Sequence, residues 1–90
     1  MEDFFYERDG QVEEVLTLNG CRTGTTYVIC DILSLISDKN RIRLLELGFI
    51  KGKKVKVITK SLLKKTLLIE ISGYTLSLRK DIADLVVVKQ

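Results

Sequence analysis

Side chains that commonly carry catalysis or bind metal ions are scarce in this chain of 90 residues. It contains no histidine, so the usual base for a serine or cysteine nucleophile is missing. Its two cysteines, Cys21 and Cys30, are too few for a transition-metal site, which usually draws three or four ligands from histidine, cysteine and carboxylates. The acidic start, Met1-Glu2-Asp3, is unlike a secretory signal, so we expect both cysteines to be reduced and mostly buried.

Carboxylates and glycines also miss the arrangements that catalysis requires. The carboxylates that could act as acid and base gather in residues 1–14, where nothing is expected to hold them at a working separation. The phosphate-binding pattern G-x-x-x-x-G-K-[ST] is absent, and turn geometry explains Gly48 and Gly52. We therefore expect no enzymatic activity, no bound cofactor and no metal-ligating residue.

Charge is divided along the chain. The net charge is +3, but residues 1–14 are acidic, with Arg8 as their only cation, and residues 39–65 are strongly basic, with Glu46 as the main acidic exception. Such segregation favours an electrostatic interaction surface. A simpler interpretation is that lysines keep a small barrel in solution and protect its sheet edges. The sequence leaves both interpretations open.

Residues 41–57 must position most of these cations. A period of 3.6 predicts a short amphipathic helix, with Ile42, Leu45 and, less tightly, Phe49 on one apolar face. Gly48 follows the helix and supplies the left-handed conformation that lets the chain reverse direction. The basic side chains of the helix therefore point away from its apolar face.

Short strands are predicted on both sides of this helix. A turn at Lys51-Gly52 leads into the second strand, and Gly73-Tyr74 is expected to connect two later strands as a tight hairpin. In the first strand, Val28, Cys30 and Ile32 are expected to share one face. The strands are predicted over residues 25–33, 53–59, 67–72, 75–79 and 85–88, with single helical turns within 15–24 and 80–84.

Five strands with one short helix between the first two predict a mainly β domain, a small and partly open barrel over residues 15–90. Residues 1–14 are interpreted as an acidic N-terminal extension, mobile or loosely docked. Two apolar clusters leave alternatives open. Phe4-Phe5-Tyr6 packs on the barrel or engages a partner, and Leu62-Leu63 is tucked onto the barrel end or exposed for a partner.

Two stretches, RLLELGFIKGKKVKVI and IEISGYTLSLRKDIADLVVV, resemble the FeoA family of small proteins associated with bacterial ferrous-iron transport. The resemblance covers roughly residues 16–88, and its most specific parts are LGF-x-x-G and G-Y-x-L-x-L-R. It implies an SH3-like barrel. Residues 61–66 depart from the family, because relatives often carry proline and glycine there. We interpret the remaining motif residues as fold determinants: Leu47, Gly48, Phe49, Gly52, Gly73 and Leu78.

The resemblance implies a non-enzymatic, cytoplasmic accessory or adapter protein of ferrous iron uptake, with a family-level link to transition metal ions. It is expected to act by protein contact with the FeoB transporter, through the cytosolic region of FeoB. We expect it to lie outside the membrane, to bind no small-molecule substrate, and to be a monomer or weak homodimer. The predicted contact residues, chosen for charge and exposure, are Arg41, Arg43, Lys53, Lys54, Lys56, Leu62, Leu63, Lys64 and Arg79.

An alternative function is regulatory. FeoA-like domains also resemble the C-terminal domains of iron-dependent repressors, and a basic face could bind nucleic acid weakly through its phosphates. Against this, the chain has no helix-turn-helix unit, and its aromatic residues do not interleave with its lysines as a base-stacking platform requires. We therefore do not expect nucleic acid to be the main partner.

Overall fold

The structure, a computed structural model, describes residues 4–8 and 11–90, with side chains from residue 15 onward. Most of the described chain is β-strand. The strands are β1 (Phe4–Arg8), β2 (Gln11–Thr17), β3 (Thr26–Ile32), β4 (Lys54–Ser61), β5 (Thr66–Ile71), β6 (Tyr74–Arg79) and β7 (Val86–Lys89). The helices are the 3-10 turn η1 (Leu18–Gly20), α1 (Asp38–Glu46) and α2 (Lys80–Ala83).

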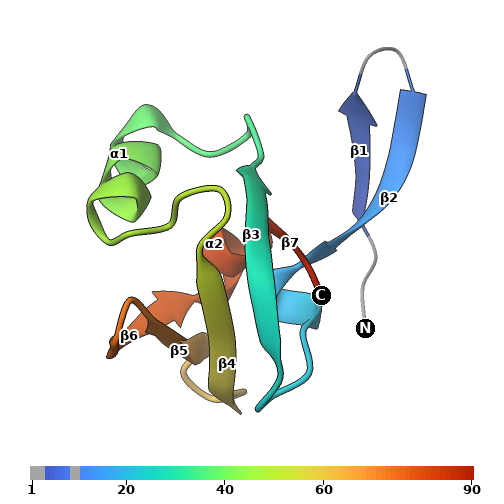
Figure 1. Ribbon diagram of the computed structural model, residues 1–90. Coiled ribbons are helices and arrows are strands. Elements are labelled where there is room, and N and C mark those ends of the chain that lie inside the picture. The colour runs from blue at the N-terminus through green and yellow to red at the C-terminus, as the bar shows by residue number, and fades with distance from the viewer. Residues whose placement is uncertain (1–3, 9–10) are drawn as a thin grey trace.

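All seven described strands belong to one antiparallel sheet, in the order β1-β2-β7-β3-β4-β5-β6 (Figure 1). Strand β7 therefore lies inside the sheet, between β2 and β3, although it comes last in the sequence. Among the described strands, no pairing joins β6 to the far side of the sheet, which stays open. The mainly β fold is confirmed. The expected five strands are the last five, with α1 between β3 and β4, and two further strands precede them.

The two extra strands come from residues 4–17. Strand β1 pairs with β2 from Phe4↔Val15 to Arg8↔Gln11, and β2 then joins β7 through Leu16↔Val88. The predicted extension over residues 1–14 thus contributes backbone to a hairpin. The side chains of Phe4-Phe5-Tyr6 are outside the part of the chain whose side chains are described. Their contact with the barrel or with a partner therefore stays a prediction, as does the mobility of the extension.

The helical turn predicted within residues 15–24 is η1, and no side chain caps its start. Thr17 precedes η1 with an extended backbone and makes no side-chain capping hydrogen bond. Its Oγ1 is buried, and within the described part of the chain it has no hydrogen-bond partner. Cys21 closes the turn instead, because its backbone N–H donates to the Leu18 carbonyl and its Sγ donates to the Thr17 carbonyl at 3.4 Å.

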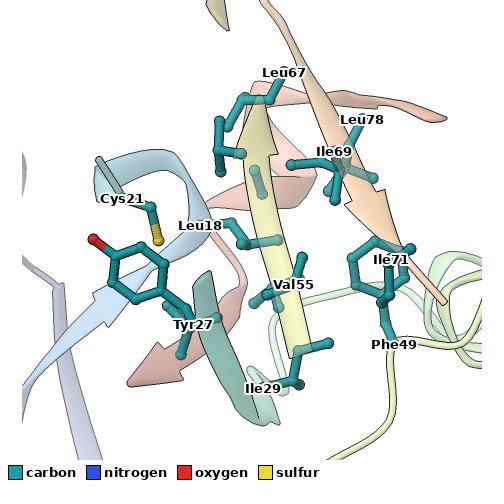
Figure 2. Packing of buried hydrophobic residues seen from close by; sticks show 14 of the residues in the cluster. Leu18, Cys21, Tyr27, Ile29, Phe49, Val55, Leu67, Ile69, Ile71 and Leu78 are labelled. Atoms are coloured by element: carbon teal, nitrogen blue, oxygen red, sulfur yellow. The ribbon is translucent and has the colours of Figure 1, made fainter. Parts of the chain in front are cut away.

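The core lies on the concave side of the curled sheet and is almost entirely aliphatic (Figure 2). Alternate residues of β4 and β5 enter it: Val55, Val57, Leu67, Ile69 and Ile71 are all buried. Phe49 is fully buried even though it lies outside any helix or strand. It follows the reversal at Gly48, which places the ring against the sheet next to Ile71.

Helix α1 buries a different face from the one predicted. Leu44 is only 2% exposed, whereas Ile42 and Leu45 are 56% and 47% exposed. The spacing of three and four residues is satisfied equally well by Leu44 with Leu47, so the period did not identify the inward face. The predicted apolar face included Phe49, but Phe49 lies beyond the end of α1 and so does not indicate which face of the helix points inward.

Strand β3 also differs from its predicted alternation. Tyr27, Ile29 and Ile32 are buried, while Val28 and Cys30 are half-buried. The register against β7 shifts between Ile29 and Asp31, which is a β-bulge. The extra residue returns Ile32 to the core side of the sheet, so the period of two breaks within the strand.

The hairpin between β5 and β6 turns one residue earlier than predicted. Ile71 pairs with Tyr74, so the two connecting residues are Ser72 and Gly73 and not Gly73 and Tyr74. Their φ angles are 53° and 82°, the left-handed values that a type I′ turn requires at both positions. This turn matches the right-handed twist of the two strands and brings Ser72 to the end of α1.

Candidate protein-interaction surface

The predicted contact residues separate into two groups at opposite ends of β4. Arg41 and Arg43 lie on α1, near the start of β4, whereas Leu62, Leu63 and Lys64 follow its end. Eight residues of strand span roughly 23 Å at 3.3 Å per residue, and Figure 1 places α1 and the β4–β5 turn at the two ends of this strand. The residues proposed from the sequence as one surface therefore form two.

Arg41 has a role within the fold. Its guanidinium donates from Nη2 to the Leu33 carbonyl at 3.1 Å and from Nη1 to the Ile32 carbonyl at 3.5 Å. These contacts tie the first half of α1 to the end of β3. Because the donors are already occupied and the side chain is half-buried, Arg41 is poorly placed to bind a partner.

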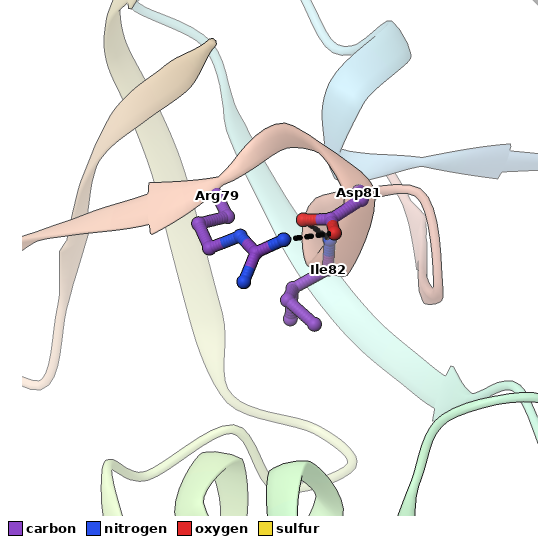
Figure 3. A network of polar contacts seen from close by, with 3 residues as sticks. All are labelled: Arg79, Asp81 and Ile82. Atoms are coloured by element: carbon purple, nitrogen blue, oxygen red, sulfur yellow. Dashed lines mark hydrogen bonds and ion pairs between the residues drawn. The ribbon is translucent and has the colours of Figure 1, made fainter. Parts of the chain in front are cut away.

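Two other predicted contact residues are engaged in exposed ion pairs. Lys56 Nζ lies 3.9 Å from Glu70 Oε1, directly across the β4–β5 pairing. Arg79 Nη2 lies 2.6 Å from Asp81 Oδ2, and Asp81 Oδ1 accepts from the Ile82 backbone N–H at the start of α2 (Figure 3). Exposed pairs of this kind add little stability and exchange readily with other partners. Arg79 is thus both paired within the fold and accessible.

A hollow of about 350 Å³ separates α1 from β6. Five of its nine lining residues are apolar: Leu44 and Leu47 from α1 and its C-cap, Leu76 and Leu78 from β6, and Ile82 from α2. The two arginines Arg43 and Arg79 lie at its border, together with Asn40 and Ser77. An apolar cleft with a few polar groups at its rim is the usual form of a binding site.

Two contacts at one end of this hollow fix α1 relative to β6. The Tyr74 hydroxyl donates to the Leu47 carbonyl, just after α1 ends. At the same place, a Cβ built on Gly48 would lie 3.0 Å from Ser72 Oγ, which shows how closely the helix end approaches the β5–β6 turn. The mouth of the hollow is therefore set by direct contacts between the helix end and the hairpin.

Strand β6 is an edge of the sheet, because it pairs only with β5 among the described strands. An edge strand presents unpaired backbone N–H and C=O groups to which another strand can add. Since β6 also lines the hollow, a free backbone edge and an apolar cleft lie side by side. The sequence predicted Arg43 and Arg79 here but missed Leu44, Leu47, Leu76 and Ile82, whose grouping depends on how α1 is oriented.

Both cysteines are free thiols, Cys21 buried and Cys30 half-buried. Burial raises the pKa of the Cys21 thiol to about 12, against an opposing effect of the nearby Lys60 charge. Cys21 therefore stays a neutral thiol, consistent with its interpretation as a small core residue, whereas a metal ligand must be a thiolate. In the part of the chain that the structure describes, no three histidine, cysteine or carboxylate side chains cluster as metal ligands would. None of the described helices has the length and apolar character of a membrane span.

The model of the FeoA domain family matches residues 16–90. This chain belongs to the FeoA family. The resemblance read from the LGF-x-x-G and G-Y-x-L-x-L-R motifs is thereby confirmed. Among curated proteins, none matches the chain by sequence.

Solved structures of FeoA proteins have the same fold. Stenotrophomonas maltophilia FeoA complexed with zinc, described as an SH3 domain protein, is 30% identical, with 82% of this chain and 89% of that chain covered and a TM-score of 0.71. Iron(II) transport protein A from Clostridium thermocellum is 23% identical with a TM-score of 0.75. The match covers 82% of this chain but only 44% of that one, so this FeoA-family chain spans less than half of that protein.

The fold also occurs in regulators. A manganese-dependent transcriptional repressor in complex with manganese matches with a TM-score of 0.79 at 20% identity, covering 93% of this chain and 41% of the repressor. At this identity the likeness concerns the fold alone. It agrees with the predicted relation between FeoA domains and a domain of metal-dependent repressors.

Proposed function

We propose that this FeoA-family protein is a non-enzymatic accessory protein of ferrous iron uptake that acts by binding the FeoB transporter. Family membership supports the iron-transport context. The hollow between α1 and β6, bordered by the free edge of β6, is the single observation that supports binding of a protein segment. Cytoplasmic location and contact with the cytosolic region of FeoB are part of the same proposal.

The geometry favours an extended segment of the partner. Such a segment adds to the edge of β6 through backbone hydrogen bonds, and its alternate side chains enter the cleft beside Leu47 and Leu76. Arg43 and Arg79 at the border favour an acidic residue in the segment and increase the rate of encounter at low salt. Backbone pairing then supplies affinity, while the cleft supplies specificity.

Nucleic acid is a weaker candidate for the partner. Arg41 donates to backbone carbonyls, and it lies on α1, at the other end of β4 from Lys64, so the predicted cations do not form one continuous basic face. The described helices also include no second helix of recognition length beside α1, since α2 has four residues. Protein contact therefore agrees better with the arrangement of these charges.

An NMR titration tests the proposal. The isotope-labelled protein is mixed with the isolated cytosolic GTPase domain of its cognate FeoB, at low and at moderate salt. We expect amide shifts along β6 and α1 that weaken as salt rises. Arg43→Glu should weaken binding about tenfold, whereas Arg22→Glu, an exposed arginine remote from the hollow, should not. Absence of shifts at high concentration, or equal effects of the two variants, would contradict the proposal.

A further inference from the structure

The turn between β4 and β5 exposes two adjacent leucines. Leu62 and Leu63 are 83% and 98% exposed, so the sequence alternative in which they tuck onto the barrel end is wrong. The turn is ordered by its own contacts, since the Lys64 backbone N–H donates to Ser61 Oγ at 3.2 Å and Lys65 adopts a φ of 53°. Exposure of two adjacent leucine side chains to water is unfavourable in free energy, and adjacent exposed apolar residues commonly mark an interaction site.

A ring of cations surrounds these leucines. Two hollows of about 560 and 550 Å³ flank the turn and share Lys80 and Asp84. Together with the turn they bring five basic side chains to one end of the molecule: Lys60, Lys64, Lys65, Arg79 and Lys80. The carboxylates in this region are Asp81, which pairs with Arg79, and Asp84. Positive charge therefore exceeds negative charge by three at this end, from five basic and two acidic groups.

The β1–β2 hairpin, remote from the turn, has an acidic sequence. Strands β1 and β2 extend away from the barrel on the side remote from the β4–β5 turn (Figure 1). Their sequence carries Glu7, Glu13 and Glu14, with Arg8 as the only cation. Helix α1 lies at the same remote end and carries Arg41 and Arg43, so the attraction of an anionic surface for the turn rests on the local excess of cations around the leucines.

We propose that the β4–β5 turn docks on the surface of an anionic phospholipid bilayer. Leu62 and Leu63 enter the headgroup region, and the surrounding lysines contact lipid phosphates. A projecting tip with apolar residues inside a ring of lysines fits a fluid, planar and negatively charged surface, to which both insertion and charge contribute. A protein partner for the leucines would need a complementary socket, and lysine offers no bidentate pairing that would fix the register of such a contact.

The proposal goes beyond the FeoB contact and does not rest on it. Membrane docking uses Leu62, Leu63 and the lysines around them, whereas the proposed FeoB contact uses the cleft between α1 and β6. Arg79 lines both regions, but the variants that test the two proposals leave it unchanged. Docking by the turn would hold the protein at the membrane and raise its local concentration there. The two proposals can therefore fail separately.

Flotation of the protein with lipid vesicles tests the docking. One set of vesicles contains phosphatidylcholine only, and the other contains equal parts of phosphatidylcholine and phosphatidylglycerol. We expect binding to the second set alone, weakening as salt rises. Leu63→Ser should lower the partition coefficient about tenfold, and Lys64→Gln about fivefold. Leu35→Ser is the matched control, because Leu35 is 85% exposed but lies at the α1 end of the molecule.

The following outcomes would contradict the membrane-docking proposal. Failure of the wild type to float with anionic vesicles would refute it, as would an equal loss of binding in the Leu35→Ser and Leu63→Ser variants. Amide spectra of each variant establish that the fold is kept, which the exposure of all three positions leads us to expect. If Leu63→Ser instead weakens binding to the FeoB domain while the wild type leaves vesicles unbound, the turn is a protein contact and the lipid proposal is wrong.

Discussion

The closeness of Gly48 and Ser72 offers a direct test of how α1 is held against β6. Gly48 has a φ of 96°, and a Cβ at this position would lie 3.0 Å from Ser72 Oγ. Gly52 has nearly the same φ, 92°, but a Cβ there meets no atom within 4 Å. The two glycines therefore separate the cost of the left-handed backbone from the cost of the close approach.

The expected magnitudes follow from these two terms. Gly52→Ala should lower the free energy of unfolding by about 1–2 kcal/mol, which is the cost of placing a residue with Cβ in a left-handed conformation. Gly48→Ala should pay the same cost and, in addition, about 0.5–1.5 kcal/mol for moving the Ser72 hydroxyl out of its present position. In a Ser72→Gly background, the penalty for displacing the Ser72 hydroxyl should vanish. Gly48→Ala and Gly52→Ala should then lower the free energy of unfolding by the same amount.

Urea unfolding followed by circular dichroism measures these differences, with the slope against urea as a check that each variant unfolds in the same way. The coupling energy between positions 48 and 72 is the decisive quantity, since any intrinsic effect of Ser72→Gly cancels in the double-mutant cycle. A coupling energy of zero would refute the claim that the helix end and the turn are in contact. A Gly52→Ala variant as stable as the wild type would refute the backbone argument itself.

Two further predictions concern the core. Leu44→Ala should lower the free energy of unfolding by about 2–5 kcal/mol, while Leu45→Ala should lower it by less than about 1 kcal/mol because Leu45 is half exposed. Urea unfolding of both variants measures these losses. Equal losses would contradict the structure and favour the helix face predicted from the sequence. The Cys21 thiol should make stability fall in alkali, because the unfolded chain releases this proton near pH 8.5 and the folded chain holds it to about pH 12. Between pH 8.5 and pH 10, the wild type should lose about 1.5 kcal/mol more stability than Cys21→Ala. Urea unfolding under reducing conditions measures this difference, and parallel losses would contradict the burial of this thiol.

Local sequence signals predicted the elements well where one principle dominates. Val55 and Val57 alternate with lysines and do form a strand with one buried face, and Gly48 does end α1 in a left-handed conformation. Prediction failed where two different residues satisfy the same periodicity. The helix period allowed either Leu44 or Leu45 to face inward, and only the packing of α1 against β6 distinguishes them.

Long-range pairing accounts for the other differences. The bulge after Ile29 in β3 depends on the register against β7, which is distant in sequence and leaves no local signal. The strands in residues 4–17 were missed because, apart from the Phe4-Phe5-Tyr6 cluster, residues 4–14 are mostly polar, which is typical of an exposed hairpin and also of an unstructured segment.

The candidate site shows the same division. The sequence identified charged and exposed residues such as Arg43, Arg79 and Leu62, since composition alone marks them as surface residues. It could not show that Arg43 and Arg79 border one cleft while Leu62 lies at the other end of β4. Arg41 illustrates the limit, because a basic residue on an exposed helix gives no sign that backbone carbonyls already occupy it.

The place of β7 inside the sheet has a consequence for how the chain acquires its fold. Residues 86–89 pair with β2 on one side and with β3 on the other, as in Val28↔Lys89, and Val86, Val87 and Val88 are all buried. During synthesis, the place between β2 and β3 therefore stays empty until nearly the whole described chain has been made. The β4–β5–β6 meander is local and can form early, whereas β2 and β3 wait for a strand that is distant in sequence from both. Until it arrives, one edge of β2 and one edge of β3 are open to pairing with other chains, so the incomplete chain is the form most exposed to aggregation.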